Sequence, residues 1–325
     1  MPKEIAHLIL AQKVCQQMPA TSIFHGPVHR FFNLFQYGAV APDTCFYYLF
    51  GPYASTIQKA CQVFHSTDSS ALQPVLGLLN HRPEPADDVL AFAAGLCCHI
   101  MTDTVFHPMV YYFSGMDDLH EGATARHRLF ETALDTCFAS RYSTKKPVRL
   151  YPVVQSVEVS QDRLVWLLRT VLCPEPMLWE RYLLWAIKYH QAAHWMFCNR
   201  IACRAVHFPA PAFMGLPPAY RNLFYLVSTP VFLPLFSHDI HFQDPETGKI
   251  SSERISGMVD KVVSQTLLLL GRIEDGFLSD RDAGAFLADP GLPDIRPCLS
   301  SRAGDFKHWH GVSDLHTILY GGGRG

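Results

Sequence analysis

A nearly uninterrupted apolar run from Ala91 to Tyr112 carries three metal-ligand side chains, His99, Asp103 and His107, at intervals of four residues. Positions i, i+4 and i+8 lie along one side of an α-helix, with about 6 Å of axial rise between successive side chains. The apolar surroundings predict that this helix is buried. A buried aspartate needs a cation or a full set of hydrogen-bond donors. The run therefore predicts a core helix that presents a row of metal ligands.

A second imidazole–carboxylate pair, His127 and Glu131, has the same spacing in another segment with helical periodicity. A single pair of this kind is more often a hydrogen-bonded pair or part of a solvated helix face. Five ligand-type residues on two helical faces make a metal site the simplest explanation.

Helical periodicity, interrupted by Pro and Gly, runs through most of the 325 residues. It predicts an all-α fold, a multi-helix bundle with the metal cleft between helices. Residues 148–159 are the only segment for which we consider an extended conformation. We expect a single domain over residues 1–325. Within it, residues 1–140 carry the metal ligands, 141–245 complete the cleft walls, and 246–325 form a C-terminal helical extension with a frayed tail.

The composition bears on the substrate and the compartment. Charged residues make up 17% of the chain and the formal net charge is -2, so there is no basic excess of the kind that nucleic-acid backbones select. No apolar signal segment begins the sequence, and its ten cysteines contain no Cys-x-x-Cys pair. We therefore expect buried thiols and a cytoplasmic location.

Three further elements precede the apolar run. They are Glu4-Ile5-Ala6-His7, then Gly38 to Asp43 followed by Phe46-Tyr47-Tyr48, and then Val63-Phe64-His65. Together with the two ligand pairs, and in this order, they resemble the zinc-dependent phospholipase C family. That family also includes the N-terminal domain of glycosylphosphatidylinositol-specific phospholipase D. The resemblance covers roughly residues 1–140.

The resemblance implies two to three zinc ions. Asp43, His65, His99 and Asp103 would hold the first ion, and His107, His127 and Glu131 would hold the second. His7 would hold a third ion, with Asp103 as a bridge. In secreted family members the third ion also uses the N-terminal amine, and in this chain Glu4 is an alternative oxygen ligand.

The resemblance also implies a reaction, in which a zinc-activated water attacks the phosphorus of a phospholipid or related phosphodiester. Asp43 would be both a ligand and the catalytic group that orients or deprotonates this water. Two alternatives remain open, a single-strand-specific zinc nuclease-like enzyme and a noncatalytic helical protein with a structural or decayed zinc site. A ligand set with several carboxylates and no cysteine favours catalysis, because structural zinc sites are mostly Cys-rich.

The second half of the chain offers weaker signals. His190 and His194 lie on an aromatic-rich helix that we expect to wall the cleft, and we assign no role to His238 or His241. The segment from Phe208 to Phe242 is dense in Phe, Leu and Tyr but is interrupted by prolines, so it is not expected to span a bilayer. It is either core or a lipid-contacting rim of the cleft. We therefore expect a phospholipid partner and peripheral membrane contact, with nucleic acid less favoured.

Overall fold

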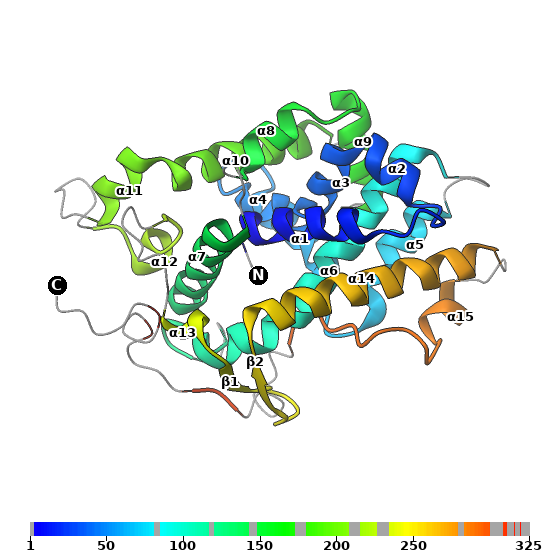
Figure 1. Cartoon of the computed structure of the whole chain (residues 1–325). Coiled ribbons are helices and arrows are strands. Elements are labelled where there is room, and N and C mark those ends of the chain that lie inside the picture. Colours follow the sequence, from blue (N-terminus) through cyan, green and yellow to red (C-terminus); the bar gives the residue numbers. More distant parts are fainter. Residues whose placement is uncertain are drawn as a thin grey trace.

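The computed structural model describes residues 3–80, 85–116, 120–142, 148–172, 180–207, 215–225, 234–278, 283–299 and 308–310, with Leu315 and Leu319. Helices predominate among these residues, and the strands in this part of the chain form one short antiparallel hairpin (Figure 1). The prediction of an all-α fold is confirmed.

Helix α6 (Asp87–Ser114) is the core helix that the apolar run predicts. Asp87 and Asp88 occupy its first turn, where negative charge stabilises the positive end of the helix dipole. The helix stops at Gly115, whose φ of 78° favours glycine. It is long and apolar enough to cross a membrane, but 94% of its most apolar window is buried inside the protein. Its hydrophobicity is thus accounted for by core packing.

Two glycines allow α3 (Phe32–Gly38) to pack directly on α6. A Cβ atom added to Gly95 would lie 2.2 Å from the Phe35 carbonyl oxygen, and one added to Gly38 would lie 2.6 Å from the Phe92 carbonyl oxygen. The two backbones are therefore in contact, which no larger residue would permit. This close approach brings Ala39, just after α3, beside His99, one turn beyond Gly95.

The helices α1 (Glu4–Gln17), α7 (Ala123–Tyr142) and α14 (Ile255–Leu278) also pack against α6. In Figure 1, α14 is the long yellow-orange helix that lies beside α1 and α6. The other helical elements are α2 (His25–Arg30), η1 (Ala41–Tyr47), α4 (Ala54–Ala60), η2 (Cys61–His65), η3 (Ser69–Leu72), α5 (Gln73–Leu79), α8 (Leu150–Gln155), α9 (Gln161–Leu172), α10 (Glu180–Cys198), α11 (Arg200–His207), α12 (Pro218–Arg221), α13 (Pro234–Ser237) and α15 (Ala283–Leu287).

The extended conformation considered for residues 148–159 is wrong, because this segment contains α8. Leu150, Val153 and Val154 are buried at the i, i+3, i+4 spacing of a helix face, and this packing overrides the strand propensity of the valines.

The hairpin was not predicted. Strands β1 (Ile240–Gln243) and β2 (Ile250–Glu253) pair in antiparallel register, with Ile240 opposite Glu253. Only β1 alternates buried and half-buried or exposed residues. Four-residue strands leave a weak periodic signal. The turn between them runs from Asp244 to Gly248, whose φ of 72° favours glycine.

The cysteines agree with the prediction of buried thiols. The nine cysteines among the described residues are free thiols, and seven of them are buried.

The prediction for the segment from Phe208 to Phe242 falls partly on residues 208–214 and 226–233, which lie outside the described residues. In its described part, Phe224, Phe236 and Phe242 are buried, so these three phenylalanines belong to the core and form no lipid rim.

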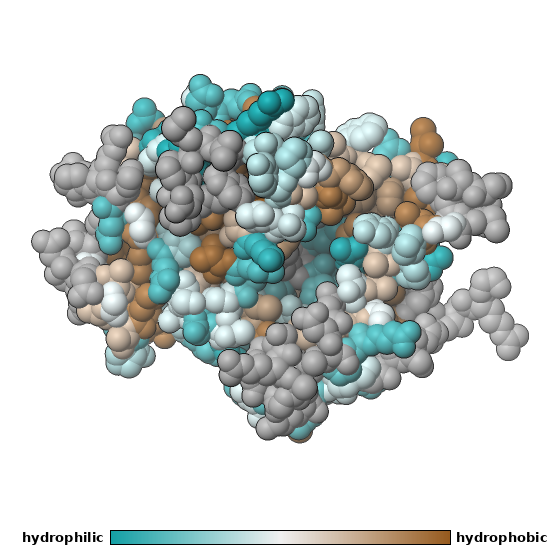
Figure 2. Space-filling model, turned by 180° about the vertical axis from the view of Figure 1, so that it is seen from behind, coloured by the Kyte–Doolittle hydropathy of each residue, from teal (hydrophilic) through white to brown (hydrophobic). Residues whose placement is uncertain are grey.

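The surface of the protein carries both hydrophobic and hydrophilic residues. Seen from behind, it carries small hydrophobic patches interspersed with hydrophilic residues (Figure 2).

Candidate metal centre

The ligand-type residues come from five elements that meet beside α6. They are His7 on α1, Asp43 on η1, His65 at the end of η2, His99, Asp103 and His107 on α6, and His127 and Glu131 on α7. Their side chains range from fully buried to 15% exposed. The structure thus brings together all eight residues that the sequence singled out.

Asp103 lies at the centre of this group and faces four imidazoles. Its Oδ1 atom lies 3.3 Å from His7 Nε2 and 3.9 Å from His107 Nε2. Its Oδ2 atom lies 3.2 Å from His99 Nε2 and 3.8 Å from His65 Nε2. One carboxylate therefore presents each of its oxygens to a different pair of histidines, which is the arrangement that a bridging ligand requires.

Backbone carbonyl groups fix the orientation of three of these histidines. The Nδ1 atom of His99 lies 3.0 Å from the Ala39 oxygen, and that of His65 lies 2.9 Å from the Cys61 oxygen. His107 Nδ1 makes the same contact with the Pro297 oxygen. A carbonyl oxygen only accepts hydrogen bonds, so each Nδ1 carries a proton and Nε2 is the nitrogen turned toward Asp103, where the neutral form of the ring offers a lone pair. Such contacts typically orient metal-binding histidines.

The polar atoms at the centre are not satisfied by the protein alone. No hydrogen-bond partner among the described residues reaches His99 Nε2, His107 Nε2 or either carboxylate oxygen of Asp103, although all four atoms are buried. Lone pairs of nitrogen and oxygen facing one another at this distance repel unless a cation or a proton lies between them. The residues present therefore fit metal ions, and their imidazole and carboxylate donors suit zinc.

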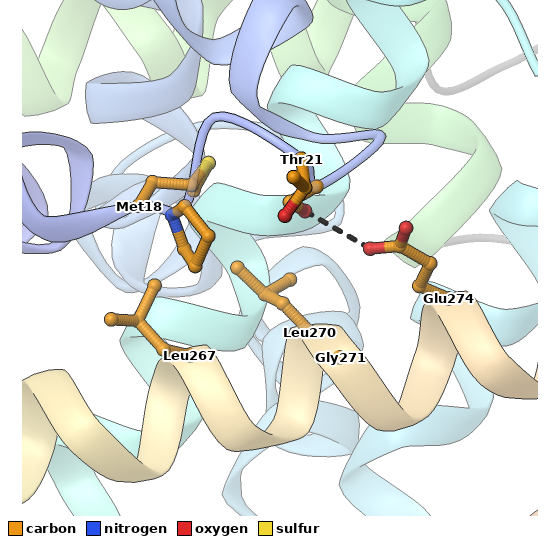
Figure 3. Close-up of a pocket in the computed structure, with 8 residues that line it drawn as sticks. Met18, Thr21, Leu267, Leu270, Gly271 and Glu274 are labelled. Carbon is orange, nitrogen blue, oxygen red and sulfur yellow. Dashed lines mark hydrogen bonds between the residues drawn. The ribbon is translucent and has the colours of Figure 1, made fainter.

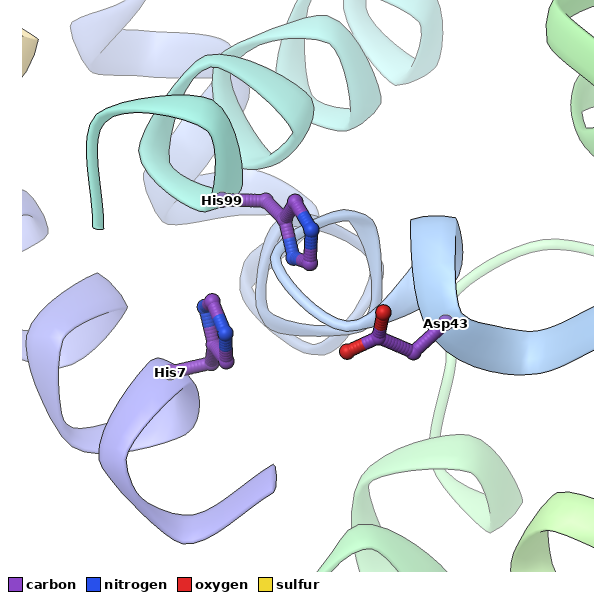
Figure 4. Close-up of side chains that lie close together, drawn as sticks. All are labelled: His7, Asp43 and His99. Atoms are coloured by element: carbon purple, nitrogen blue, oxygen red, sulfur yellow. The ribbon is translucent and has the colours of Figure 1, made fainter. Parts of the chain in front are cut away.

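Three groups of these side chains have ligand atoms within 4.8 Å of one another. The groups are His7, Asp43 and His99; His65, His99 and Asp103; and His107, His127 and Glu131. Figure 4 shows the first group, in which the side chains of α1, η1 and α6 point toward a common space. The third group is the set that the resemblance assigned to the second ion. The other two groups differ from the sets that the resemblance implied for the first and third ions. Asp43 is grouped with His7 and His99, although its carboxylate also lies near His65.

The protonation states also suit metal binding. Burial lowers the pKa of His7, and it holds the pKa of His107 and His127 well below the usual range. These three imidazoles are therefore neutral near pH 7, as metal ligands must be.

Burial also acts to lower the pKa of His99, but the Asp103 and Asp43 carboxylates outweigh it and raise this pKa, so a bound cation would have to displace a proton there. Burial acts to raise the pKa of the Asp103 carboxyl, but the nearby His99 and His107 hold it well below its usual range. Asp103 is therefore ionised.

Glu4, the alternative ligand for the third ion, turns away from these groups. Its carboxylate lies 3.1 Å from His190 Nε2 and accepts a hydrogen bond from the Tyr47 hydroxyl. It belongs to none of the three ligand groups.

Two structural contributors were missed from the sequence. Asp135, one turn after Glu131 on α7, accepts hydrogen bonds from the backbone N–H groups of Ile5 and Ala6 at 3.0 Å and 2.8 Å. It thereby caps α1 and seats the helix that carries His7. Pro297 lies near the other end of the chain, and its carbonyl orients His107. Neither contact leaves a sequence motif, because both join residues more than 100 positions apart.

A surface pocket elsewhere in the molecule is separate from this centre. It has a volume of about 130 Å³ and lies between the residues after α1 and the side of α14 (Figure 3). Ser22 Oγ donates to Glu274 Oε2 across its edge at 3.1 Å. Met18, on its wall, is eleven residues from His7, which is about 16 Å along a helix axis.

Fold and site define a helical protein with a cluster of histidine and carboxylate ligands around one buried aspartate. Comparison with protein families agrees, because a model of the family described as zinc dependent phospholipase C matches residues 6–169. The match spans half of the chain and includes every ligand-type residue from His7 to Glu131, so this chain belongs to the zinc-dependent phospholipase C family. No curated protein and no solved structure matched it.

Proposed function

We propose that this chain is a zinc-dependent phosphodiester hydrolase of the phospholipase C type, acting on a phospholipid or a related phosphodiester. The observation that supports it best is the shared position of Asp103, whose unsatisfied oxygens face the Nε2 atoms of His7 and His99. Two to three zinc ions would satisfy these atoms. Bound zinc supplies Lewis-acid polarisation of a phosphoryl oxygen and lowers the pKa of water.

The charge of the ligands is consistent with an anionic substrate. Asp43, Asp103 and Glu131 contribute three negative charges, which offset about half the charge of three divalent ions. The loaded centre would therefore be electropositive and would attract a phosphate group.

Asp43 is the carboxylate best placed to handle a proton. Its side chain is 9% exposed, whereas Asp103 is fully buried, so water can reach Asp43. Glu131 is 8% exposed, but its Oε1 atom already lies 2.8 Å from His127 Nε2. The Oδ1 atom of Asp43 lies 3.3 Å from His65 Nε2 and has no hydrogen-bond partner among the described residues. We infer that Asp43 orients the attacking water and accepts its proton.

An exposed apolar loop follows η1, the element that carries Asp43. Leu49, Phe50 and Tyr53 are 47%, 77% and 58% exposed. Gly51, with φ of 134°, shapes this loop, because a Cβ atom there would lie 2.4 Å from the Tyr48 hydroxyl oxygen. At the end of η1, the Phe46 ring lies 5.2 Å from the ring of His65, a ligand candidate. The loop therefore begins a few residues after a side chain that contacts a ligand candidate.

Aromatic residues of α10 extend this surface. The Tyr53 ring contacts Tyr182 at 5.7 Å, and Trp185 contacts Tyr189 at 5.8 Å. Aromatic side chains with polar edges, together with protruding Leu and Phe, suit the boundary between water and lipid. We therefore propose peripheral membrane contact through this loop in place of the segment from Phe208 to Phe242. The same surface has a cation, since Lys188 Nζ lies 5.4 Å from the Trp185 ring, so single-stranded DNA is the competing substrate.

The test is hydrolysis by the zinc-loaded chain of three substrates: phosphatidylcholine vesicles, a short soluble phosphodiester and single-stranded DNA. We expect release of the phosphorylated head group from the vesicles, and loss of this activity in Asp43→Asn. Cleavage of DNA alone would support the nuclease alternative. A zinc-loaded protein that hydrolyses none of the three would support the noncatalytic alternative.

The membrane surface is tested separately with Phe50→Asp. This change should weaken binding to the vesicles and leave hydrolysis of the short soluble ester intact. Ile250→Asp, a change at a residue that is 78% exposed on the hairpin, is the matched control and should bind vesicles as the unaltered protein does. Equal vesicle binding by Phe50→Asp and the control would contradict the surface we propose.

A further inference from the structure

His190 lies on α10, outside the segment that the family model matches, and is 1% exposed. Both of its ring nitrogens have partners. Its Nδ1 atom lies 3.2 Å from Thr44 Oγ1, and its Nε2 atom lies 3.1 Å from Glu4 Oε1. The ring also stacks on Tyr47, with centroids 4.2 Å apart and planes 9° apart. Its position is therefore fixed on three sides.

The two partners of His190 belong to segments that carry candidate ligands. Thr44 directly follows Asp43 on η1, and Glu4 lies three residues before His7 on α1. Asp43 and His7 are members of the same ligand group, with His99 as the third. One side chain of α10 thus joins the two segments that bring two of the three residues of this group together.

The hydrogen bonds around His190 have one consistent direction. The Glu4 carboxylate accepts hydrogen bonds, so His190 Nε2 carries the proton and Nδ1 is an acceptor. The Thr44 hydroxyl then donates to Nδ1, and the Tyr37 hydroxyl, 3.2 Å from Thr44 Oγ1, donates to Thr44. The two hydroxyl groups and both nitrogens of His190 thus each have a partner, whereas Glu4 Oε2 has none among the described residues. A buried chain of hydrogen bonds of this kind fixes the relative positions of the groups that it joins.

We propose that His190 is a positioning residue for the zinc position formed by His7, Asp43 and His99. It sets the separation of η1 and α1 through Thr44 and Glu4. This inference rests on the zinc binding in the proposed function and adds that one zinc position depends on a helix outside the matched family segment.

His194 provides a matched control. It lies one turn further along α10, is also 1% exposed, and has its Nε2 atom 3.6 Å from Cys198 Sγ. It makes no hydrogen bond to Thr44 or Glu4 among the described residues, although it lies close enough to the Glu4 carboxylate for each group to shift the pKa of the other. A buried imidazole of the same helix can therefore be replaced without removing the link between η1 and α1.

The experiment compares His190→Phe with His194→Phe. Phenylalanine keeps a flat ring beside Tyr47 but removes both hydrogen bonds of His190. Zinc affinity is measured by competition with chelators of graded strength, and the melting temperature of the zinc-free protein monitors the fold. Loss of a residue that orients metal ligands typically lowers affinity about 10–100-fold. We expect this loss in one zinc-binding step of His190→Phe, with partial recovery in His190→Gln, whose amide can still reach Glu4. His194→Phe should bind zinc as the unaltered protein does.

Several results would overturn the inference: unchanged zinc affinity in His190→Phe, equal weakening of every binding step, or the same loss in His194→Phe. If His190→Phe does not fold, Thr44→Val carries the test, because it removes the hydroxyl at nearly constant volume. It should weaken the same step, and unchanged affinity would refute the inference. Since no substrate is used, an unaltered protein that binds no zinc would refute the proposed function, whereas normal zinc binding by a folded His190→Phe refutes only the role of His190.

Discussion

Replacement of Asp103 by asparagine should remove more zinc than replacement of Glu131 by glutamine. Both changes keep the size of the side chain and remove one negative charge. Asp103 faces four imidazoles at 3.2–3.9 Å, and these imidazoles are drawn from all three ligand groups. Glu131 belongs only to the group with His107 and His127. The first change should therefore affect two ions and the second change only one.

The distances give the size of the effect. Two unit charges 4 Å apart at an effective dielectric constant of about 20 interact with about 4 kcal/mol. A divalent ion held between Asp103 and its imidazoles would lie within the 3.2–3.9 Å that separate their atoms, so this energy sets the scale of the effect for each ion. At about 1.4 kcal/mol per factor of ten, each affected ion should lose about three orders of magnitude in affinity.

Zinc analysis of the two purified variants, equilibrated in the same buffered free zinc, measures this difference. Asp103→Asn should retain at most one ion per chain, and Glu131→Gln should lose one ion. Circular dichroism of the zinc-free variants checks that both remain helical. Equal zinc loss in two folded variants would refute the bridging role of Asp103.

Three further changes test the account. Removal of zinc by a chelator should lower the melting temperature, and added zinc but not magnesium should restore it. A ligand present at about 1,000 times its Kd stabilises the native state by about 4 kcal/mol. An unchanged melting temperature would contradict metal binding. Gly95→Ala should destabilise the protein by about 1–3 kcal/mol or more in denaturant titrations, because its Cβ would lie 2.2 Å from the Phe35 carbonyl oxygen. The control is Gly77→Ala, whose Cβ would meet no atom from outside α5 within 4 Å among the described residues, so it should be neutral or slightly stabilising. Asp135→Ala should lower the free energy of unfolding by about 1–3 kcal/mol, because two buried backbone donors of α1 lose their acceptor. A loss no larger than that of a substitution at an exposed residue would argue against Asp135 as the cap of α1.

The core helix and its ligands could be predicted because their signal is local. The apolar run fixes α6 as a buried helix, and the spacing of His99, Asp103 and His107 places them along one side of it. The pair on α7 follows from the same rule. Local periodicity was thus sufficient to predict the all-α fold class and five of the eight ligand-type residues.

The remaining parts of the site depend on contacts between distant segments. The close packing of Gly38 on Gly95 brings Ala39 to His99, and nothing in either local sequence marks those glycines as a contact pair. Glu4 was predicted as an oxygen ligand in place of the N-terminal amine that secreted family members use. In the fold, His190 and Tyr47 bind its carboxylate. The choice between core and lipid rim for the segment from Phe208 to Phe242 stayed open for a related reason, because composition does not distinguish a buried phenylalanine such as Phe236 from an exposed one such as Phe50.

The most direct test of the central claim is a crystal structure of the zinc-loaded protein with anomalous diffraction measured at the zinc absorption edge. The account predicts two or three anomalous peaks, each within about 2 Å of nitrogen or oxygen atoms from the three ligand groups, with Asp103 bound to two of the ions. Absence of a peak beside Asp103, or a single peak elsewhere in the protein, would contradict it.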